Sequence, residues 1–276
     1  PFAGRLWQPL QDCMQPVSAA VREIHNPAKP KEQVGVIHEA SAENVDPAIK
    51  RAHSALVSWR SLSAGTRAAR LFKAADLYET HFAELIALAS REAGKTLLDG
   101  VAEIREAVDF LRYYASRVET LSDSVDPRGV FACISPWNFP LAIFTGQIGA
   151  ALAAGNCVIA KPAEQTPLIA LRAVELMHEA EIPKDVLQCL PGPGGTVGAA
   201  LAASPRIDGV CFTGSIETAQ RVHRSMATTG NPAAPLIAET GGINAMLVDS
   251  TALPEQVVRD VLVSAFQSAG QRCSAL

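Results

Sequence analysis

The last residues of the chain place a cysteine in surroundings that suit a nucleophile. Cys273 follows Gly270-Gln271-Arg272 and precedes Ser274. The glycine keeps the backbone approachable, the arginine supplies a nearby positive charge, and the small neighbours leave the thiol uncovered. A cysteine in a chain of this kind more often packs as a small hydrophobic residue. Cys273 is therefore a candidate nucleophile that needs support from the rest of the sequence.

A carboxylate and an amide are the next candidates for chemistry. Glu239 follows the apolar run 235–238 and precedes Thr240-Gly241-Gly242. We predict that it leaves a buried strand and enters a turn, where it could act as a general base or only cap the turn. Asn138 lies between Trp137 and Phe139 in a stretch without formal charge. Its amide could donate to an oxyanion or only satisfy nearby backbone groups.

Two further groups of residues suit a nucleotide. Thr213-Gly214-Ser215 joins a predicted strand to a predicted helix, where backbone N–H groups and a hydroxyl can face a phosphate, although many such turns serve geometry alone. Lys161 and Glu164 follow another predicted strand. A carboxylate there would hold ribose hydroxyls and repel a 2′-phosphate, which favours NAD over NADP, but the two residues could also be a surface pair. The turn at 192–195 does not match the G-x-G-x-x-G pattern.

These residues need a scaffold, and the pattern from residue 130 onward predicts one. Apolar runs typical of strands lie at 130–134, 157–160, 186–190, 207–212 and 236–238. Helical stretches separate them at about 144–154, 167–181, 195–203 and 215–228. This alternation predicts an α/β fold with a doubly wound, Rossmann-like parallel sheet, in which ligands bind at the carboxyl ends of the strands.

The rest of the chain divides around this sheet. We expect residues 1–40 to be an irregular N-terminal segment, with at most a short strand at 34–37. Residues 41–240 form the predicted NAD-binding domain, with helices after Ser41, at about 66–91 and at 97–118 in its helical part (41–120) and the sheet at 130–240. Residues 241–276 begin a second domain, with a strand at 245–248 and a helix at about 254–267.

Composition disfavours several classes of partner. The net charge of −4 and the scattered Lys and Arg residues give no basic field for nucleic acid. The uncharged stretch 129–160 is broken by Gly and Pro into pieces too short to cross a bilayer. No C-x-x-C pair or zinc-spaced histidine occurs, so we expect no metal site. We interpret Cys133, Cys157, Cys189 and Cys211 as buried strand residues of a cytoplasmic protein.

Several short motifs, taken in chain order, resemble the aldehyde dehydrogenase superfamily. They are Pro136-Trp137-Asn138-Phe139-Pro140, Lys161-Pro162-Ala163-Glu164, Phe212-Thr213-Gly214-Ser215, Glu239-Thr240-Gly241-Gly242 and Gly270-Gln271-Arg272-Cys273. Glu239 precedes Cys273 by 273 − 239 = 34 positions, which also fits the superfamily. Residues 104–111, 135–148 and 268–276 look like the glutamate-semialdehyde (1-pyrroline-5-carboxylate) dehydrogenase half of bifunctional proline utilization A. The resemblance covers most of the chain from about residue 25.

The resemblance implies NAD-dependent oxidation of L-glutamate γ-semialdehyde, formed from 1-pyrroline-5-carboxylate, to L-glutamate in proline catabolism. Cys273 would attack the aldehyde, Asn138 and the Cys273 N–H would hold the oxyanion, and Glu239 would activate water to hydrolyse the thioester. The implied cofactor-binding residues are Ser135, Pro136, Trp137, Lys161, Glu164, Gly194, Thr213, Gly214, Ser215, Thr240 and Gly241. Phe139 and Ser274 would contact the small aldehyde substrate. The full-length protein would be a homo-oligomer.

The sequence also departs from the family pattern. Ala219 stands where the family often has a glycine, and Ile243 stands where we expect a different side chain. We expect the second, catalytic domain to be truncated after Cys273, so that this chain alone is feebly active or inactive. The alternatives are an aldehyde dehydrogenase for another substrate, an inactive NAD-binding fragment, and a cysteine hydrolase or acyltransferase. The hydrolase would need a histidine base, which histidines in helices and linkers do not supply.

Overall fold

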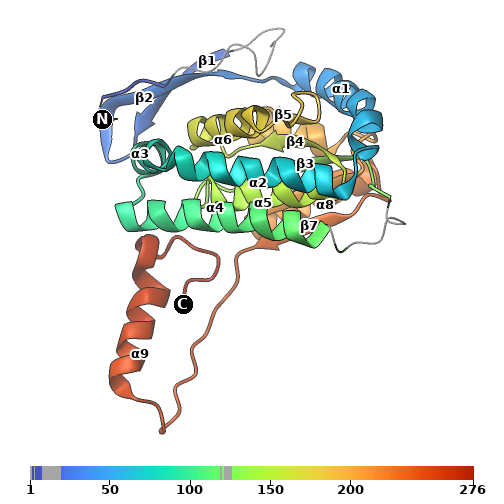
Figure 1. Cartoon of the computed structure of the whole chain (residues 1–276). Coiled ribbons are helices and arrows are strands. Elements are labelled where there is room, and N and C mark those ends of the chain that lie inside the picture. The colour runs from blue at the N-terminus through green and yellow to red at the C-terminus, as the bar shows by residue number, and fades with distance from the viewer. Residues whose placement is uncertain (1, 3, 8–19, 119, 121–125) are drawn as a thin grey trace.

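The computed structural model describes residues 2, 4–7, 20–118, 120 and 126–276. Cys13 and its neighbours at 8–19 lie outside the described residues. A parallel sheet with helices on both faces forms the body of the molecule, and residues 241–276, which we call the arm, project from it (Figure 1). The prediction of an α/β fold with a parallel sheet is confirmed.

The strands are β1 (Ala20–Asn26), β2 (Lys29–Glu39), β3 (Val130–Ile134), β4 (Cys157–Lys161), β5 (Leu187–Cys189), β6 (Gly209–Gly214) and β7 (Leu236–Thr240). The longer helices are α1 (Ala42–Arg60), α2 (Ala64–Thr80), α3 (Phe82–Ala93), α4 (Leu97–Val118), α5 (Ala142–Ala153), α6 (Pro167–Glu179), α8 (Ile216–Thr228) and α9 (Pro254–Val261). Short helical turns are η1 (Gly194–Gly198), α7 (Ala199–Ala202), η2 (Leu262–Phe266) and η3 (Gln267–Gly270).

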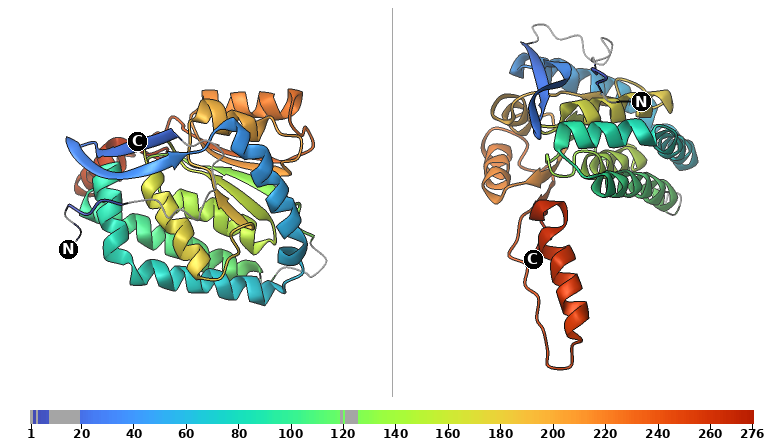
Figure 2. Two further views of the ribbon diagram at one scale, coloured as in Figure 1. Left: turned by 90° about the horizontal axis from the view of Figure 1, so that it is seen from above. Right: turned by 90° about the vertical axis from the view of Figure 1, so that its left-hand side faces the viewer.

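The sheet has the strand order β5-β4-β3-β6-β7, and every pairing in it is parallel. The chain therefore adds β4 and β5 on one side of β3, crosses back, and adds β6 and β7 on the other side. Because such crossovers are right-handed, the reversal places α5 and α6 on one face and α7 and α8 on the opposite face. Contacts of α2, α3 and α4 with α5 and α6 add an outer helical layer (Figure 2).

The inner strands are buried on both faces, which explains their unbroken apolar sequences. Every residue of β3 and β4 is buried. Cys133 of β3 lies in register with Cys211 of β6, and Cys157 and Cys189 are buried in β4 and β5. The prediction that these cysteines occupy buried strand positions is confirmed.

The helical part differs from prediction at one point, because the expected helix at 66–91 is two helices. They meet at His81, whose φ of −94° and ψ of 19° interrupt the helix. His81 contacts Glu84, three residues along the chain, and Arg172 of α6, so one partner that is distant in the sequence helps to stabilise the break. Gly94 ends α3 in the left-handed conformation with φ 68°, as its place after the apolar pattern predicts.

No helix in the described part of the chain is long and apolar enough to cross a membrane.

The expectation of an irregular N-terminus is wrong for residues 20–39, because β1 and β2 form an antiparallel hairpin. At its tight turn the Asn26 side chain accepts a hydrogen bond from the Ala28 N–H (2.9 Å). Most hairpin side chains are polar and partly exposed, and register shifts interrupt the pairing, so no clean alternation marks these strands in the sequence. Val34 and Ile37 anchor the hairpin in the core.

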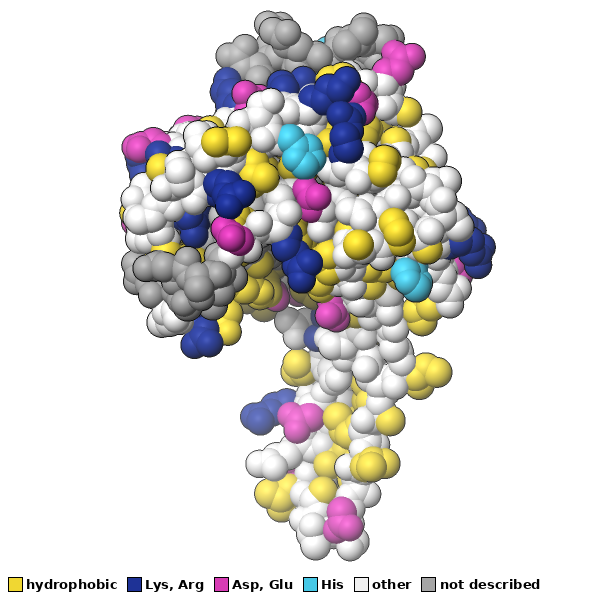
Figure 3. Space-filling view, turned by 90° about the vertical axis from the view of Figure 1, so that its right-hand side faces the viewer, with side chains coloured by type: hydrophobic (Ala, Val, Ile, Leu, Met, Phe, Trp, Pro, Cys, Tyr) yellow, Lys and Arg dark blue, Asp and Glu magenta, His cyan; other side chains and the backbone are white. Residues whose placement is uncertain are grey.

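The expected strand at 245–248 is also absent, since residues 241–249 run without strand pairing. The arm then returns toward the body through α9 and η2 (Figure 1). Ile243, Leu247 and Phe266 are exposed, and hydrophobic side chains gather along the arm in Figure 3. A strand needs a neighbour for its backbone groups, and no described strand lies beside this segment.

Two buried glutamates join the outer helical layer to the helices on the sheet. Glu92 of α3 accepts hydrogen bonds from the N–H groups of Leu168 (2.7 Å) and Ile169 (2.9 Å) at the start of α6. Glu103 of α4 accepts in the same way from two N–H groups at the start of α5. These N–H groups have no partner within their own helix, so each carboxyl satisfies donors that would otherwise be orphaned.

The Glu92 carboxyl makes stability depend on pH. Burial raises its pKa to about 8, although the two backbone donors oppose the shift. The folded state therefore binds this proton more tightly than the unfolded state, where a glutamate pKa is about 4.3. The stabilisation is complete below about pH 4 and is lost as the pH rises toward about 8. We expect the free energy of unfolding to fall relative to Glu92→Gln by up to about 1.4 kcal/mol per pH unit in this window.

Urea unfolding of both proteins between about pH 5 and pH 8 measures this difference. A difference in unfolding free energy that does not change with pH would contradict the prediction.

Candidate active site

Most of the predicted site residues meet at the carboxyl edge of the sheet, where they line a cavity of about 700 Å³. This position is where doubly wound sheets bind ligands, because helices leave opposite faces and open a crevice between neighbouring strands. The predicted residues that line it are Ser135, Pro136, Trp137, Asn138, Lys161, Glu164, Gly194, Thr213, Gly214, Ser215, Thr240, Gly241 and Cys273. Segments that lie far apart in the sequence therefore form one open cavity.

Glu239, Phe139 and Ser274 do not line this cavity. The prediction that Glu239 leaves a buried strand is wrong, because Glu239 lies within β7 and is exposed. The strand is at the edge of the sheet, and even Ile237 beside it is 53% exposed. Phe139 instead lies under the ammonium group of Lys95, 4.7 Å from its ring centroid.

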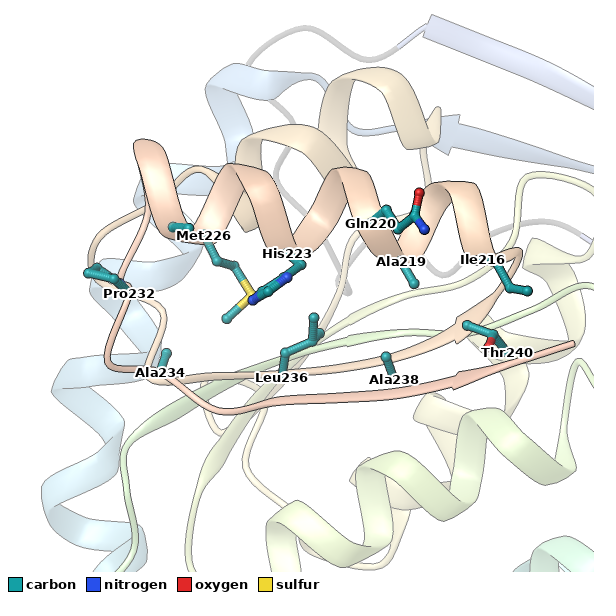
Figure 4. A pocket seen from close by; sticks show the side chains of 11 residues that line it. Ile216, Ala219, Gln220, His223, Met226, Pro232, Ala234, Leu236, Ala238 and Thr240 are labelled. Atoms are coloured by element: carbon teal, nitrogen blue, oxygen red, sulfur yellow. The ribbon is translucent and has the colours of Figure 1, made fainter.

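A second cavity, between α8 and β7, shows which residues of β7 face α8 (Figure 4). Its volume is about 560 Å³, and its walls are mostly aliphatic. Leu236, Ala238 and Thr240 of β7 all line it. Because side chains alternate along a strand, the Glu239 side chain lies on the opposite face of the sheet. Thr213, the register partner of Glu239 in β6, accepts a hydrogen bond from Gln147 of α5, so this is the face that α5 covers.

The loop after β4 is held by contacts from two other parts of the chain. Glu164 accepts a hydrogen bond from the Gly194 N–H (2.5 Å), and Arg22 of β1 donates to the Glu164 carbonyl (2.6 Å). Lys161 ends β4 and is only 4% exposed. Burial lowers the pKa of Lys161, and the Glu164 carboxylate opposes that shift. The arrangement holds a carboxylate and an amine side by side at the strand end.

The turn after β6 presents the N-terminus of α8 to the cavity. The Ser215 hydroxyl accepts a hydrogen bond from the Thr218 N–H (3.2 Å), so it caps the helix. Glu217 also lines the cavity, and hydrogen bonds from its own backbone N–H and from Ser215 lower its pKa. The sequence prediction missed Glu217, although its place in the first turn of the helix after Thr213-Gly214-Ser215 is a usable signal.

The loop that carries Cys273 is exposed and contacts the predicted oxyanion donor. Asn138 Nδ2 donates to the Gln271 carbonyl (2.9 Å), across 133 residues of sequence. Asn244 Nδ2 donates to the Cys273 carbonyl (2.8 Å) and holds the other side of the loop. Arg272, the expected nearby charge, donates instead to the Val263 carbonyl (2.8 Å) in η2. The structure therefore brings Asn138 and the Cys273 loop together.

A smaller cavity of about 280 Å³ continues from the first one between η1, α7 and α8. Gly195, Gly198 and Ala202 form a wall of small residues, and Phe212 and Val222 face it. The sequence prediction did not identify this slot, because its walls come from helix surfaces whose spacing gives no separate motif. A mostly apolar slot beside a larger cavity that is lined by Lys161, Glu164 and Glu217 suits a ring joined to a charged chain.

The residues of the site also bear on other chemistries. All six histidines lie within the described ranges, and none lines the cavity that contains Cys273. A cysteine hydrolase would need such a base within hydrogen-bond reach of the thiol. Among the described residues, no group of three or more His, Cys, Asp or Glu side chains is placed to hold a metal ion.

Known proteins are similar to this chain in both sequence and fold. The model of the "Aldehyde dehydrogenase family" matches residues 15–276. The bifunctional protein PutA of Escherichia coli (strain K12) is 53% identical over 277 residues, which cover 98% of this chain and 21% of PutA. A 1-pyrroline-5-carboxylate dehydrogenase of Bacillus cereus (strain B4264) is 37% identical over 268 residues, which cover 91% of this chain and 52% of that enzyme.

Among solved structures, 1-pyrroline-5-carboxylate dehydrogenase from Thermus with bound NAD matches with a TM-score of 0.91 and 33% identity. The match covers 99% of this chain and 56% of that one. The chain therefore spans about a fifth of the PutA sequence and about half of the shorter dehydrogenases.

The exposure of Cys273 predicts selective modification. Iodoacetamide added to the folded chain should alkylate Cys273 well before Cys133, Cys157, Cys189 and Cys211, because those four thiols are buried. Peptide mapping by mass spectrometry at increasing times measures each cysteine, with the peptide that contains Cys13 counted separately. Unfolding in guanidinium should remove the difference. Equal rates for Cys273 and the four buried cysteines in the folded chain would contradict the exposed loop.

Proposed function

Because this chain belongs to the aldehyde dehydrogenase family, we propose that it forms the NAD-binding part of an enzyme that oxidises an aldehyde through a cysteine thioester. The observation that carries the proposal is the convergence of the Cys273 loop and the Asn138 amide at a cavity on the carboxyl edge of the sheet. The reaction needs a nucleophile, an oxyanion donor and a site for the nucleotide, together with a base for the water that hydrolyses the thioester.

The cavity residues suit a dinucleotide. Lys161 and Glu164 would bind the adenosine ribose, since a lysine and a carboxylate offer both a donor and acceptors to its hydroxyls. The Glu164 carboxylate would repel a 2′-phosphate, which supports NAD over NADP. The N-terminus of α8 after Ser215 would face the pyrophosphate. The adjoining slot of about 280 Å³ would take the adenine ring.

The chain's own residues would perform the covalent steps. The Cys273 thiolate attacks the aldehyde carbon and forms a thiohemiacetal, while the Asn138 amide and the Cys273 N–H stabilise the oxyanion. NAD, when bound, supplies the hydride acceptor. Glu239 removes a proton from the water that hydrolyses the thioester and releases the acid and the thiolate.

For Asn138 and Glu239 these roles require local rearrangement from the arrangement described above. Asn138 must exchange its hydrogen bond to the Gln271 carbonyl for one to the substrate oxygen. Glu239 must turn from the face of β7 that it occupies toward Cys273, since it does not line the cavity. Glu239 lies in an exposed segment, and Trp137 beside the half-buried Asn138 is exposed, which leaves room for these movements.

The relatives support a substrate. PutA and the 1-pyrroline-5-carboxylate dehydrogenases suggest L-glutamate γ-semialdehyde, oxidised to L-glutamate in proline catabolism. Phe139 and Ser274 would lie near the aldehyde. We further propose a cytoplasmic, homo-oligomeric whole protein, and the buried strand cysteines support a reducing compartment. The domain boundaries at residues 40 and 240 remain part of the proposal.

Calorimetry tests the cofactor assignment on this chain. NAD should bind more tightly than NADP, and Glu164→Gln should narrow that difference about tenfold, because it removes the charge that repels the 2′-phosphate. Lys50→Gln is a control that should leave both affinities unchanged, because Lys50 forms an exposed ion pair on α1 and does not line the cavity. Equal binding of the two nucleotides by the parent chain would contradict the NAD preference.

Turnover tests the chemical assignment on the full-length protein. Cys273→Ala should abolish NADH formation from glutamate semialdehyde, and Asn138→Ala should lower kcat by about 10² to 10³ with little change in unfolding temperature. Full activity of Cys273→Ala would refute the thioester mechanism. NAD binding without any thiol-dependent turnover would instead support a binding fragment, and faster turnover of another aldehyde would reassign the substrate.

A further inference from the structure

Lys95 connects the two loops of the candidate site to the helical layer. Its ammonium nitrogen lies 3.4 Å from Glu103 Oε1, 3.2 Å from Ser268 Oγ and 4.7 Å from the centroid of the Phe139 ring. Ser268 belongs to the loop that leads to Cys273, and Phe139 follows Asn138. A single side chain thus contacts both the nucleophile loop and the loop of the oxyanion donor.

The backbone fixes Lys95 at this place. Gly94 ends α3 in the left-handed conformation, and the Lys95 N–H returns a hydrogen bond to the Ala89 carbonyl (3.2 Å). One residue later, Thr96 Oγ1 accepts from the Asp99 N–H (3.1 Å) and begins α4. Lys95 is therefore the short link between two capped helix ends, and its Cα has little freedom to move.

The carboxylate partner is fixed just as firmly. Glu103 Oε2 accepts from the N–H groups of Leu141 (3.2 Å) and Ala142 (2.9 Å), which begin α5 directly after the Asn138 loop. The side chains of Lys95 and Glu103 are only 7% and 1% exposed. Burial raises the pKa of Glu103, and the Ala142 N–H and the charge of Lys95 oppose that shift. A buried ion pair of this kind holds its geometry, since separating the charges leaves each one desolvated and unpaired.

The nucleophile loop needs such an anchor. Ser268 and Ala269 have φ of 53° and 56°, a region that side chains other than glycine rarely adopt. Every residue from 267 to 276 is at least partly exposed, so apolar packing contributes little to holding the loop. A hydrogen bond from the buried ammonium of Lys95 to Ser268 holds the loop at the residues whose φ angles are unfavourable.

We propose that Lys95 is a positioning residue, whose ammonium ties the loop that carries Cys273 to the loop that carries Asn138. The inference rests on the proposed roles of Cys273 and Asn138, but the contact itself is a property of this chain without substrate or cofactor. Its test therefore measures the position of the loop and not turnover.

Ser268→Ala is the first variant, because it removes the hydroxyl and leaves the buried ion pair intact. Hydrogen exchange of the Gln271 N–H, which donates to the Ser268 carbonyl (3.1 Å), reports local opening of the loop. We expect this N–H to exchange about tenfold faster in Ser268→Ala, as the loss of one hydrogen bond to a charged donor implies. The exchange of amides in β3 should not change. An unchanged Gln271 rate would overturn the proposal.

The second comparison separates positioning from a general structural role. Lys95→Met with Glu103→Gln removes the pair without leaving a buried charge, and it should accelerate Gln271 exchange to a similar extent. Adding Ser268→Ala to that background should then change the rate by less than about twofold, since the contact is already lost. Multiplied effects of the two changes would contradict a shared contact. Lys50→Met, which breaks the exposed pair with Asp46 (2.9 Å), is the control and should have no effect.

The two proposals fail in distinguishable ways. If Ser268→Ala loosens the loop and turnover of the full-length protein does not depend on Cys273, the positioning contact stands and the thioester mechanism is wrong. If turnover depends on Cys273 and the Gln271 exchange rate is unchanged, the mechanism stands and Lys95 does not position the loop.

Discussion

The parallel pairing of β3 with both β4 and β6 is the constraint on which the rest of the structure depends. Since strands are added first on one side of β3 and then on the other, the helices that follow β3 and β6 lie on opposite faces of the sheet. The strand ends at that point cannot be covered by either helix, which opens the cavity. Every residue that touches the cavity from the sheet does so because its strand ends at this edge.

Buried polar contacts transmit this geometry outward. The carboxyl groups of Glu92 and Glu103 begin α6 and α5, so the outer helices determine where the sheet helices start. Such contacts are strong only when every group is satisfied, because an unpaired buried charge is costly. The same layer supplies Lys95, whose hydrogen bond to Ser268 links the Cys273 loop to helices that contribute no residue to the cavity.

The arm contrasts with the body. Its hydrophobic side chains are exposed, its first segment has no strand partner, and Glu239 at its root does not line the cavity. The body is held by burial and paired strands, whereas the arm is held near Cys273 by a few side-chain hydrogen bonds from Asn138, Asn244 and Lys95. The cavity and the Cys273 loop therefore differ in how firmly the rest of the described chain holds them.

The sequence by itself determined the elements whose signals are local. Unbroken apolar runs located the strands from β3 to β7, turn residues located their ends, and helical spacing located α1 and α4, because burial imposes these periods on neighbouring residues. Most of the cavity residues followed, since residues at the ends of parallel strands share one edge.

Only the tertiary structure decided the features that depend on distant partners. These include the break at His81, the polar hairpin of β1 and β2, the exposure of Glu239 and the absence of a strand at 245–248. The contacts of Lys95 with Ser268 and of Asn138 with Gln271 join residues more than a hundred positions apart. No local pattern encodes such contacts, because they arise only when separate elements pack against one another.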